Sequence, residues 1–537
     1  MSIRAHTPKN VAIWWVKRDV RLFDNQALTQ ALARNKIVLP VFLQEPLLLN
    51  GPDWGDFHTH ALQTGASALS QNLNHFGSGL LVFKLSPIEA VQQISALISE
   101  LGYVVSEVYS HEETGLNHTF ERDKTFSLWC GNNNIKWYEF TNNGVVRGPI
   151  DRDYWDKHFK GYISKSVLGV PKDKLLVSFP DELKQVFNHH LQQNHPPLKL
   201  HQAPSEYSSV SERYARSILK DFLWVRGKKY RGGISSMNKA PSACSRLSTQ
   251  LAWGALSLRT VLQECDNRLQ HLVEAQRATP EENHQQWISS LRNFISRLFW
   301  HAHFVQKLES EVEMEFQAVN KAFREGVPYI THELDEVEHN KRLQAWLYGE
   351  TGFPAIDAAM RYYQKHGWLN FRSRAMITSF ACNALRLPWQ TVMYELSKLM
   401  VDYVPGIHVS QIQMQAGITG INAIRIYSPQ KQLHDHDPKC HFVRSMIPEL
   451  RSLKAEQIMA LNHENLAPEY TNPIIDFKQE SKIMKDALYG ISKSVSGRQN
   501  AKQVFKKHGS RKRNTSKGQS KPKAKTSIQD TPQLKLF

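Results

Sequence analysis

The short stretch SRLFWHAHF, residues 296–304, contains four side chains that are capable of binding a planar or anionic partner. They stand at relative positions zero, three, four and seven, which together form one face of a helix. Aromatic faces stack well on planar rings, and guanidinium and imidazole groups add hydrogen bonds. A plain core stripe is the alternative explanation for the two aromatic members. The face consists of Arg297, Trp300, His301 and Phe304.

A second candidate site lies in SACSRLSTQLAWGALSLR, residues 242–259. Small hydroxyl residues directly before a helix offer hydroxyls and backbone N–H groups to a phosphate, and the helix dipole favours negative charge there. The string SRLS is weak evidence when it stands alone, so the site depends on the rest of the chain.

The most specific pattern lies in residues 350–450. It reads ETGFPAIDAAMRYYQKHGWLNFRSRAMITSF, then VDYVPGIH and RIYSP, and closes on HFVRSMIPEL. These motifs closely resemble the flavin-binding helical domain of the photolyase/cryptochrome family. The resemblance implies FAD as cofactor and blue-light-driven electron transfer, usually to a damaged pyrimidine pair in DNA.

The resemblance also implies individual flavin contacts. Arg374 and Asp402 match the family's Arg–Asp pair beside the isoalloxazine, where a reduced anionic flavin needs a cation and a buried Arg needs a partner. His408 takes the position facing flavin N5, where photolyases commonly have Asn, and its charge can change near neutral pH. Cys244 replaces the family's Thr or Ser and removes one hydroxyl donor. The other predicted FAD contacts are Tyr230, Ser245, Arg246, Leu247 and Ser248.

The substrate-facing positions depart from the family pattern. Trp300 keeps the Trp that stacks on a flipped-out dimer, whereas the Glu that bonds a cyclobutane dimer is Arg297 here and the Arg after the Trp is His301. The photoproduct-facing Asn is Phe371, and the Met of cyclobutane-dimer enzymes is Ala375. The two-histidine pattern of animal (6-4) photolyases, at those same positions, is also absent. These departures resemble a bacterial variant branch of the DNA photolyases that shares SRLxWHxHFxQKLE and PGIHxxQxQMQAG.

Two sets of roles follow from this resemblance. The side chains expected to face the DNA lesion are Arg297, Trp300, His301, Phe304, Phe371 and Arg372. Catalytic roles are assigned to Trp300, His408, Arg297 and His301.

The electron-transfer chain of the family is altered as well. Of its three tryptophans only the middle one has a match, Trp389, while the proximal and distal positions hold Ile412 and Glu336. An aliphatic side chain has no accessible oxidation state, so electrons cannot follow the usual path. Replacements for the missing carriers could come from Tyr403, Tyr394 or Tyr427, and the sequence does not choose between them.

Around these sites, hydrophobic periodicity predicts two architectures. Short apolar strands alternate with helices over residues 1–144, which indicates a doubly wound parallel α/β domain. Its first strand leads into a loop where such sheets bind ligands, and the family holds an antenna chromophore in this domain, so a second chromophore of unknown identity is possible. Residues 145–204, polar and rich in Pro and His, are expected to form an inter-domain linker. Residues 205–490 are predicted to form an all-helical FAD-binding domain.

Charge and composition bear on the partners of the protein, on its location and on metal binding. The 537 residues carry a formal net charge of +17, and twelve Lys or Arg without an acid fall within 493–525. Residues 491–537 are therefore predicted to be a basic disordered tail with affinity for phosphate backbones. No apolar run long enough to span a membrane and no signal peptide is seen, so we expect a cytoplasmic protein, interpreted as a monomer. The five scattered cysteines and the irregularly spaced histidines give no support for a metal site.

Two functions compete at this point. The first is a DNA photolyase that splits cyclobutane or (6-4) pyrimidine dimers in UV-damaged DNA with an electron from reduced FAD. The second is a cryptochrome-type blue-light photoreceptor without repair activity, which the missing Glu and the tail favour. A flavoprotein that binds single strands or RNA without repair is a minor variant of the second.

Overall fold

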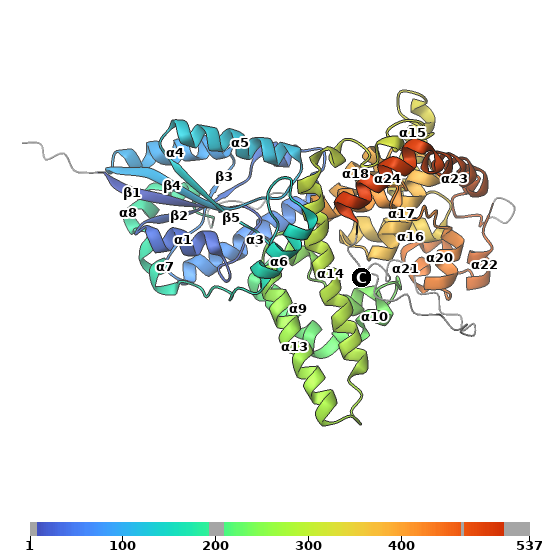
Figure 1. Cartoon of the computed structure of the whole chain (residues 1–537), viewed down its shortest axis with the longest axis horizontal. Coiled ribbons are helices and arrows are strands. Elements are labelled where there is room, and N and C mark those ends of the chain that lie inside the picture. Colours follow the sequence, from blue (N-terminus) through green and yellow to red (C-terminus); the bar gives the residue numbers. More distant parts are fainter. Residues whose placement is uncertain (1–7, 193–208, 463–466, 510–537) are drawn as a thin grey trace, which may run out of the picture.

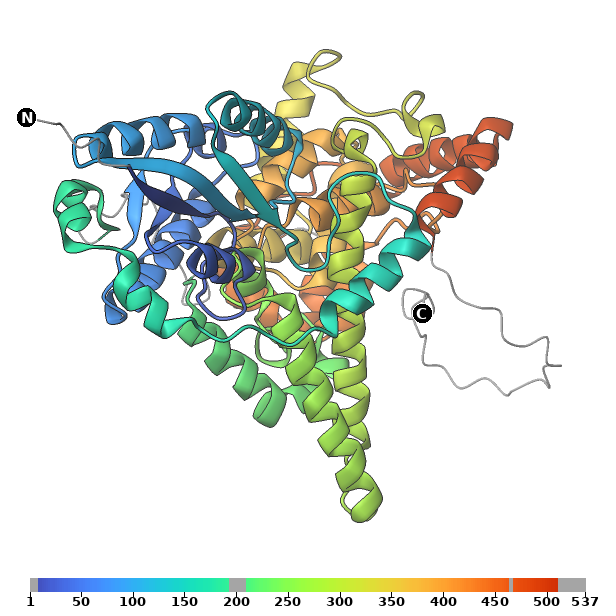
Figure 2. The same ribbon diagram turned by 60° about the vertical axis from the view of Figure 1, so that its left-hand side comes forward.

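The computed structural model describes residues 8–192, 209–462 and 467–509. An α/β domain in blue and cyan lies on one side of the molecule, and helices in yellow to red lie on the other (Figure 1). The long helices α13 (Leu258–Ala278) and α14 (Gln285–Ser310) form a hairpin whose tip projects from the body in both views (Figure 2). The predicted division into an α/β part and a helical part is confirmed.

The α/β domain is built on a five-stranded, all-parallel sheet in the order β3-β2-β1-β4-β5. Its central strand carries the apolar run VAIWWV, whose six residues are all buried. Such continuous burial is expected of a parallel strand covered by helices on both faces. The strands are β1 (Lys9–Val16), β2 (Val38–Leu43), β3 (Leu81–Phe83), β4 (Tyr103–His111) and β5 (Lys136–Phe140).

Local signals start and stop the helices that cover this sheet. In the helix after β3, Pro87 takes the first position and Ser86 forms a capping box with Glu89, which satisfies two free N–H groups. Gly102 follows with φ +74°, which a residue without Cβ adopts readily. The helices are α1 (Gln26–Arg34), α2 (Pro46–Leu49), α3 (Asp56–His75), α4 (Pro87–Ser99) and α5 (Asn117–Asn132).

The segment predicted as a solvated linker is largely helical and packed, which corrects that prediction for residues 145–192. Trp155 is fully buried, with its ring centroid 5.6 Å from that of Phe299 on α14, and Phe159 lies 5.4 Å from the same ring. These aromatic contacts fix the segment against the helical domain. Its helices are α6 (Arg152–Ile163), α7 (Lys172–Ser178) and α8 (Asp181–Val186). Residues 193–204 lie outside the described part.

The C-terminal domain is helical in the described residues, as predicted. Its helices besides α13 and α14 are α9 (Glu212–Asp221), α10 (Tyr230–Gly233), α11 (Ala240–Ala243), α12 (Ser248–Ala252), α15 (Glu336–Tyr348), α16 (Pro354–His366), α17 (Phe371–Asn383), α18 (Trp389–Lys398), α19 (Pro405–Gln415), α20 (Pro429–His436), α21 (His441–Met446) and α22 (Ala455–Met459).

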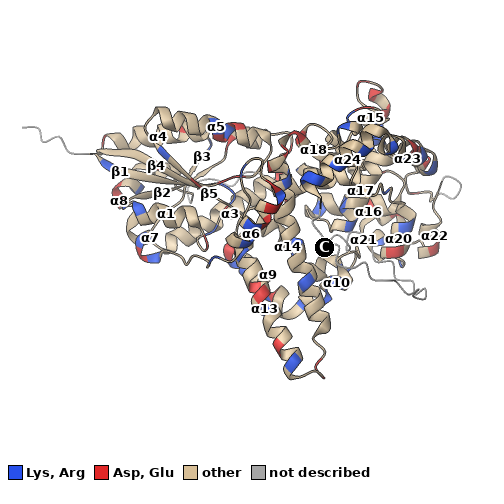
Figure 3. Ribbon diagram, in the orientation of Figure 1, with Lys and Arg blue, Asp and Glu red and all other residues tan. Residues whose placement is uncertain are grey.

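The beginning of the predicted disordered tail is also helical. α23 (Phe477–Lys493) leads into α24 (Val495–His508), whose end carries basic residues (Figure 3). Val504 and His508 are buried, and Lys507 and His508 both contact Glu311, with 3.0 Å between His508 Nε2 and the carboxylate. This anchoring overrides the basic composition that predicted disorder. Residues 510–537, the rest of that prediction, lie outside the described residues.

Three findings bear on membranes, metals and disulfides. Across the described ranges, no helix is both long and apolar enough to cross a membrane. The same ranges hold no group of three or more His, Cys, Asp or Glu that could bind a metal ion. All five cysteines are free thiols.

Candidate functional site

The helical domain encloses a cavity of about 880 Å³, near the upper end of the roughly 300–1,000 Å³ of small-molecule sites. Helices α10, α14, α17, α19 and α24 contribute to its wall. All but two of the predicted site residues line it: Tyr230, Cys244, Ser245, Arg246, Ser248, Arg297, Trp300, His301, Phe304, Phe371, Arg372, Arg374, Asp402 and His408. Leu247 is buried beside the cavity without lining it, and Trp389 lies buried at the start of α18.

The pair predicted to face the isoalloxazine forms a bidentate ion pair on the cavity wall. Arg374 Nη2 lies 2.8 and 3.0 Å from the two carboxylate oxygens of Asp402, and Arg374 Nε donates to the Leu369 carbonyl at 2.7 Å. Burial opposes the charge on Arg374, but Asp402 outweighs burial and raises the guanidinium pKa above its usual value. Arg374 therefore stays positively charged at the cavity and is held in place by Asp402, which suits a ligand with a negatively charged polar edge.

His408 lines the cavity as predicted, but its electrostatic role needs correction. Burial lowers its pKa to about 4, so the imidazole stays neutral near pH 7 and does not titrate there. Its Nε2 lies 2.8 Å from the Met393 carbonyl. Because a carbonyl only accepts, Nε2 carries the proton and Nδ1 remains an acceptor. The residue can therefore accept a hydrogen bond but cannot supply a positive charge.

Hydrogen bonds from Arg226 fix the backbone of the loop at residues 244–248. Arg226 donates to the carbonyls of Cys244 and Ser245, the latter at 2.7 Å. Arg246 has φ +63° and its guanidinium lies 3.7 Å from the ring centre of Trp368; this left-handed backbone costs a side-chain-bearing residue about 1–3 kcal/mol. The following helix, α12, spans only five residues, so the dipole assistance expected from the sequence is small.

The aromatic face predicted on α14 opens into the same cavity rather than into the core. Trp300 and Phe304 stack with ring centroids 5.2 Å apart and an angle of 24° between their planes. Beside them, burial lowers the pKa of His301 to about 4, and neither of its ring nitrogens has a hydrogen-bond partner among the described residues. A neutral imidazole with free hydrogen-bonding capacity is costly to bury, so this position favours a polar ligand.

Two further predicted residues stand at the start of α17. Phe371 is 41% exposed although its ring is large and apolar, and it lines the cavity. The guanidinium of Arg372 lies 5.9 Å from the ring centre of Tyr427 and also lines the cavity. An exposed aromatic ring next to a cation is a suitable surface for a base and its phosphate.

Sequence reasoning missed several cavity residues. Buried polar atoms without a hydrogen-bond partner in the described structure line the wall, and they would be satisfied by a ligand rich in donors and acceptors, which is the chemistry of FAD. These atoms belong to Asn293, Tyr363, Ser410 and Gln411. Phe505 and His508 of α24 also line the cavity, but their segment had been assigned to the tail. Trp368 was detectable, because it lies within the GWLNFRSR motif.

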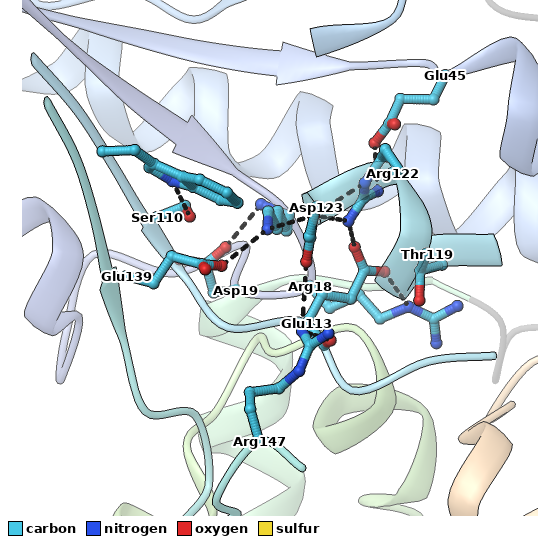
Figure 4. A network of polar contacts seen from close by, with 12 residues as sticks. Arg18, Asp19, Glu45, Ser110, Glu113, Thr119, Arg122, Asp123, Glu139 and Arg147 are labelled. Atoms are coloured by element: carbon cyan, nitrogen blue, oxygen red, sulfur yellow. Dashed lines mark hydrogen bonds and ion pairs between the residues drawn. The ribbon is translucent and has the colours of Figure 1, made fainter. Parts of the chain in front are cut away.

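A network of buried charges occupies the carboxyl ends of β1 and β4, where the strand order reverses (Figure 4). Arg122 pairs with Glu45, Glu113 and Asp123 at 2.7, 2.7 and 2.8 Å. Arg147 links Asp123 to Glu309 of the helical domain, at 3.2 and 3.4 Å. This edge is where the sequence predicted an antenna chromophore, and here it connects the two domains electrostatically.

Glu315, which joins the domains near this network, gives a pH prediction. It accepts from the Asn117 N–H at 2.7 Å, and burial raises its pKa from 4.5 to about 7. The contribution of Glu315 to the free energy of unfolding is therefore fully present at pH values below the pKa that this group has in the unfolded state. It is lost as the pH rises through about 7, the pKa of the folded state. At pH 8, the free energy of unfolding of Glu315→Gln, measured by urea titration, should exceed that of the parent by up to about 3 kcal/mol. Most of this difference should vanish at pH 5. An equal difference at both pH values would contradict the assignment.

Two known protein families match this chain, one in the α/β domain and one in the helical domain. Residues 12–163 match the DNA photolyase family, and residues 294–489 match the family described as the FAD binding domain of DNA photolyase. The chain belongs to the photolyase/cryptochrome family, as its motifs predicted, and FAD is the cofactor of its helical domain.

Known members of the family match this chain along most of its length. A deoxyribodipyrimidine photo-lyase of Vibrio cholerae is 26% identical over 87% of this chain and 97% of its own length. A cryptochrome DASH of Synechocystis is 24% identical over 88% and 96%. The solved archaeal photolyase of Sulfolobus tokodaii, described with two FAD molecules and the implication of a novel light-harvesting cofactor, has a TM-score of 0.67 at 20% identity, covering 89% and 100%. This structural likeness supports the fold.

Proposed function

We propose that this chain is a light-driven DNA repair flavoprotein, a photolyase-type lyase that splits UV-induced pyrimidine dimers. The observation that carries the proposal is that one cavity joins the Arg374–Asp402 pair with the open Trp300–Phe304 stack. The first arrangement suits a reduced flavin and the second suits a planar base. Their shared cavity would bring electron donor and lesion together without a long transfer through the protein.

The residues of the cavity divide into holding and positioning roles. Arg374 and Asp402 would fix the polar edge of FAD, and the 244–248 loop would hold its phosphates, with the backbone conformation of Arg246 already set. Bound and reduced, FAD supplies the electron that opens the dimer. His408, neutral with Nδ1 unprotonated, would accept a hydrogen bond from the ligand and would thereby hold its orientation.

Other residues of the cavity suit the lesion. A damaged pair is already poorly stacked, so turning it out of the duplex costs only about a few kcal/mol, and the Trp300 face would replace part of the lost stacking. Arg297 and Arg372 would contact polar edges and phosphates. His301 would supply a neutral donor or acceptor in place of the charged Arg of other family members.

The test is binding of short oligonucleotides with and without UV irradiation, in the dark and at several salt concentrations. We expect the irradiated strand to bind at least about tenfold more tightly, equal to ~1.4 kcal/mol. The affinity of both strands should fall with salt, because phosphate contacts release counterions. Equal affinity for irradiated and intact DNA would overturn the lesion-binding part of the proposal.

A second function, a photoreceptor without repair, is favoured by the position of α24. Phe505 and His508 form part of the cavity wall, and Glu311 holds the end of α24 against α14. A change of flavin charge would be felt at this helix. The photoreceptor hypothesis predicts that blue light speeds tryptic cleavage within 495–509, whereas a repair enzyme needs no such change. The named relatives include both photo-lyases and cryptochromes DASH.

A further inference from the structure

A file of aromatic rings leads from the cavity wall to the surface of the α/β domain. The ring centroid of Tyr403 lies 5.6 Å from that of His408, which lines the cavity. On its other side Tyr403 stacks on His58 of α3, at 5.2 Å with 17° between the planes. His58 in turn lies 5.2 Å from Trp54, which is half-buried. The rings therefore follow one another in near contact from the flavin site outwards.

The usual electron path of this family lacks two of its three tryptophans in this chain, and the structure shows where their replacements lie. Ile412, buried in the cavity wall, and Glu336, exposed at the start of α15, occupy two of its three positions. Trp389 keeps the middle position, yet its neighbours in that path cannot be oxidised. The aromatic file uses none of these three residues.

We propose that electrons reach the flavin of this protein through Tyr403 and Trp54, with the ring of His58 as the bridge between them. The proposal rests on the proposed FAD site and adds the route by which the cofactor is reduced. It also resolves the choice among the three candidate tyrosines in favour of Tyr403.

The surroundings of Tyr403 allow it to be oxidised. Its ring is buried, and burial together with the nearby carboxylate of Asp53, the residue directly before Trp54, raises the pKa of its hydroxyl well above the usual value. Tyr403 gives one electron to the photoexcited flavin and its phenolic proton to the Asp53 carboxylate. Trp54 then returns an electron to Tyr403 while Asp53 returns the proton. This leaves oxidised Trp54 at the surface, where a soluble thiol reduces it.

The bridge is rigid and neutral. The Gly55 N–H donates to His58 Nδ1 at 3.3 Å, and His58 Nε2 donates to the Met400 carbonyl at 2.7 Å. Burial lowers the pKa of His58 to about 3, so the bridging ring itself carries no positive charge near pH 7. Both nitrogens are satisfied, which keeps the ring parallel to that of Tyr403.

Trp253 is the alternative final electron donor to Trp54, because its ring centroid lies 6.0 Å from those of both His58 and Trp54. The guanidinium of Arg18 lies 4.8 Å from the centre of the Trp253 ring. A cation over the ring disfavours a second positive charge there. Trp54 follows the Asp53 carboxylate instead, which favours the oxidised state at Trp54.

The experiment compares Tyr403→Phe and Trp54→Phe with Trp389→Phe in the full chain loaded with FAD. Each change keeps a ring in place but makes it much harder to oxidise. Under blue light with dithiothreitol, we expect flavin photoreduction to slow at least about tenfold in the first two variants, or ~1.4 kcal/mol in the barrier. The tryptophanyl radical signal in the electron paramagnetic resonance spectrum should also disappear in Trp54→Phe.

The outcomes separate this route from the proposed function itself. FAD content and light-driven repair after chemical reduction should be unchanged in both variants, since neither residue lines the cavity. Normal photoreduction in Tyr403→Phe overturns the route, whether or not Trp389→Phe is slow. A slow Tyr403→Phe with a normal Trp54→Phe overturns the exit at Trp54. Failure of repair in the parent protein would affect only the proposed function.

Discussion

Arg374→Leu is expected to purify without FAD. The substitution leaves the Asp402 carboxylate buried without its bidentate partner, and it removes the fixed cation from the cavity wall. Breaking a buried ion pair on one side costs about 3–5 kcal/mol, and the free energy of unfolding of the apoprotein should fall by a similar amount. The measurements are the flavin absorbance per protein chain and urea unfolding of the same preparation.

A matched control is available on a neighbouring helix. Arg361 pairs with Glu449 at 2.9 Å, but neither residue lines the cavity. Arg361→Leu should therefore keep its FAD although it also loses an Arg–carboxylate pair. A full complement of FAD in folded Arg374→Leu would refute the assignment of this pair to the flavin.

Trp300→Ala should have the second large effect, on the lesion rather than on the cofactor. Stacking of a base on an aromatic side chain contributes about 1–3 kcal/mol. Preference for irradiated over intact oligonucleotides should therefore fall roughly 5- to 150-fold. FAD content should be retained, because the Arg374–Asp402 pair is untouched. Dark binding by fluorescence anisotropy measures the preference directly.

Trp287→Ala is the control for this prediction, since Trp287 lies on the same helix, α14, and does not line the cavity. Both variants lose one tryptophan of α14, and only Trp300→Ala should lose lesion preference. If both variants lost the preference equally, the effect would come from the helix and not from the stacking face.

The sequence was most informative where local signals and tertiary packing agree. The apolar run VAIWWV predicted a covered strand, and Pro87 marked the first turn of α4; the structure confirms both. The motifs of residues 350–450 identified the cavity wall, because family motifs specify residues that must meet around one ligand. These predictions needed no knowledge of long-range contacts.

The predictions that the structure corrected all depended on such contacts. The basic composition after residue 490 predicted disorder, yet buried Val504 and the Glu311 contacts of its last turn hold α24 as a helix. Trp155 and Phe159 offered a helical signal four residues apart, but the Pro and His of the same segment outweighed it. The neutral state of His408 follows from burial, which its type alone does not specify.

Repair of defined lesions by the fully reduced protein tests the central claim most directly. Oligonucleotides with one cyclobutane dimer or one (6-4) photoproduct are illuminated with blue light, each beside a dark control. Chemical reduction of FAD beforehand removes any dependence on the electron route. We expect light-dependent restoration of at least one of the two lesions. No restoration of either, with FAD bound and fully reduced, would contradict repair and favour the photoreceptor.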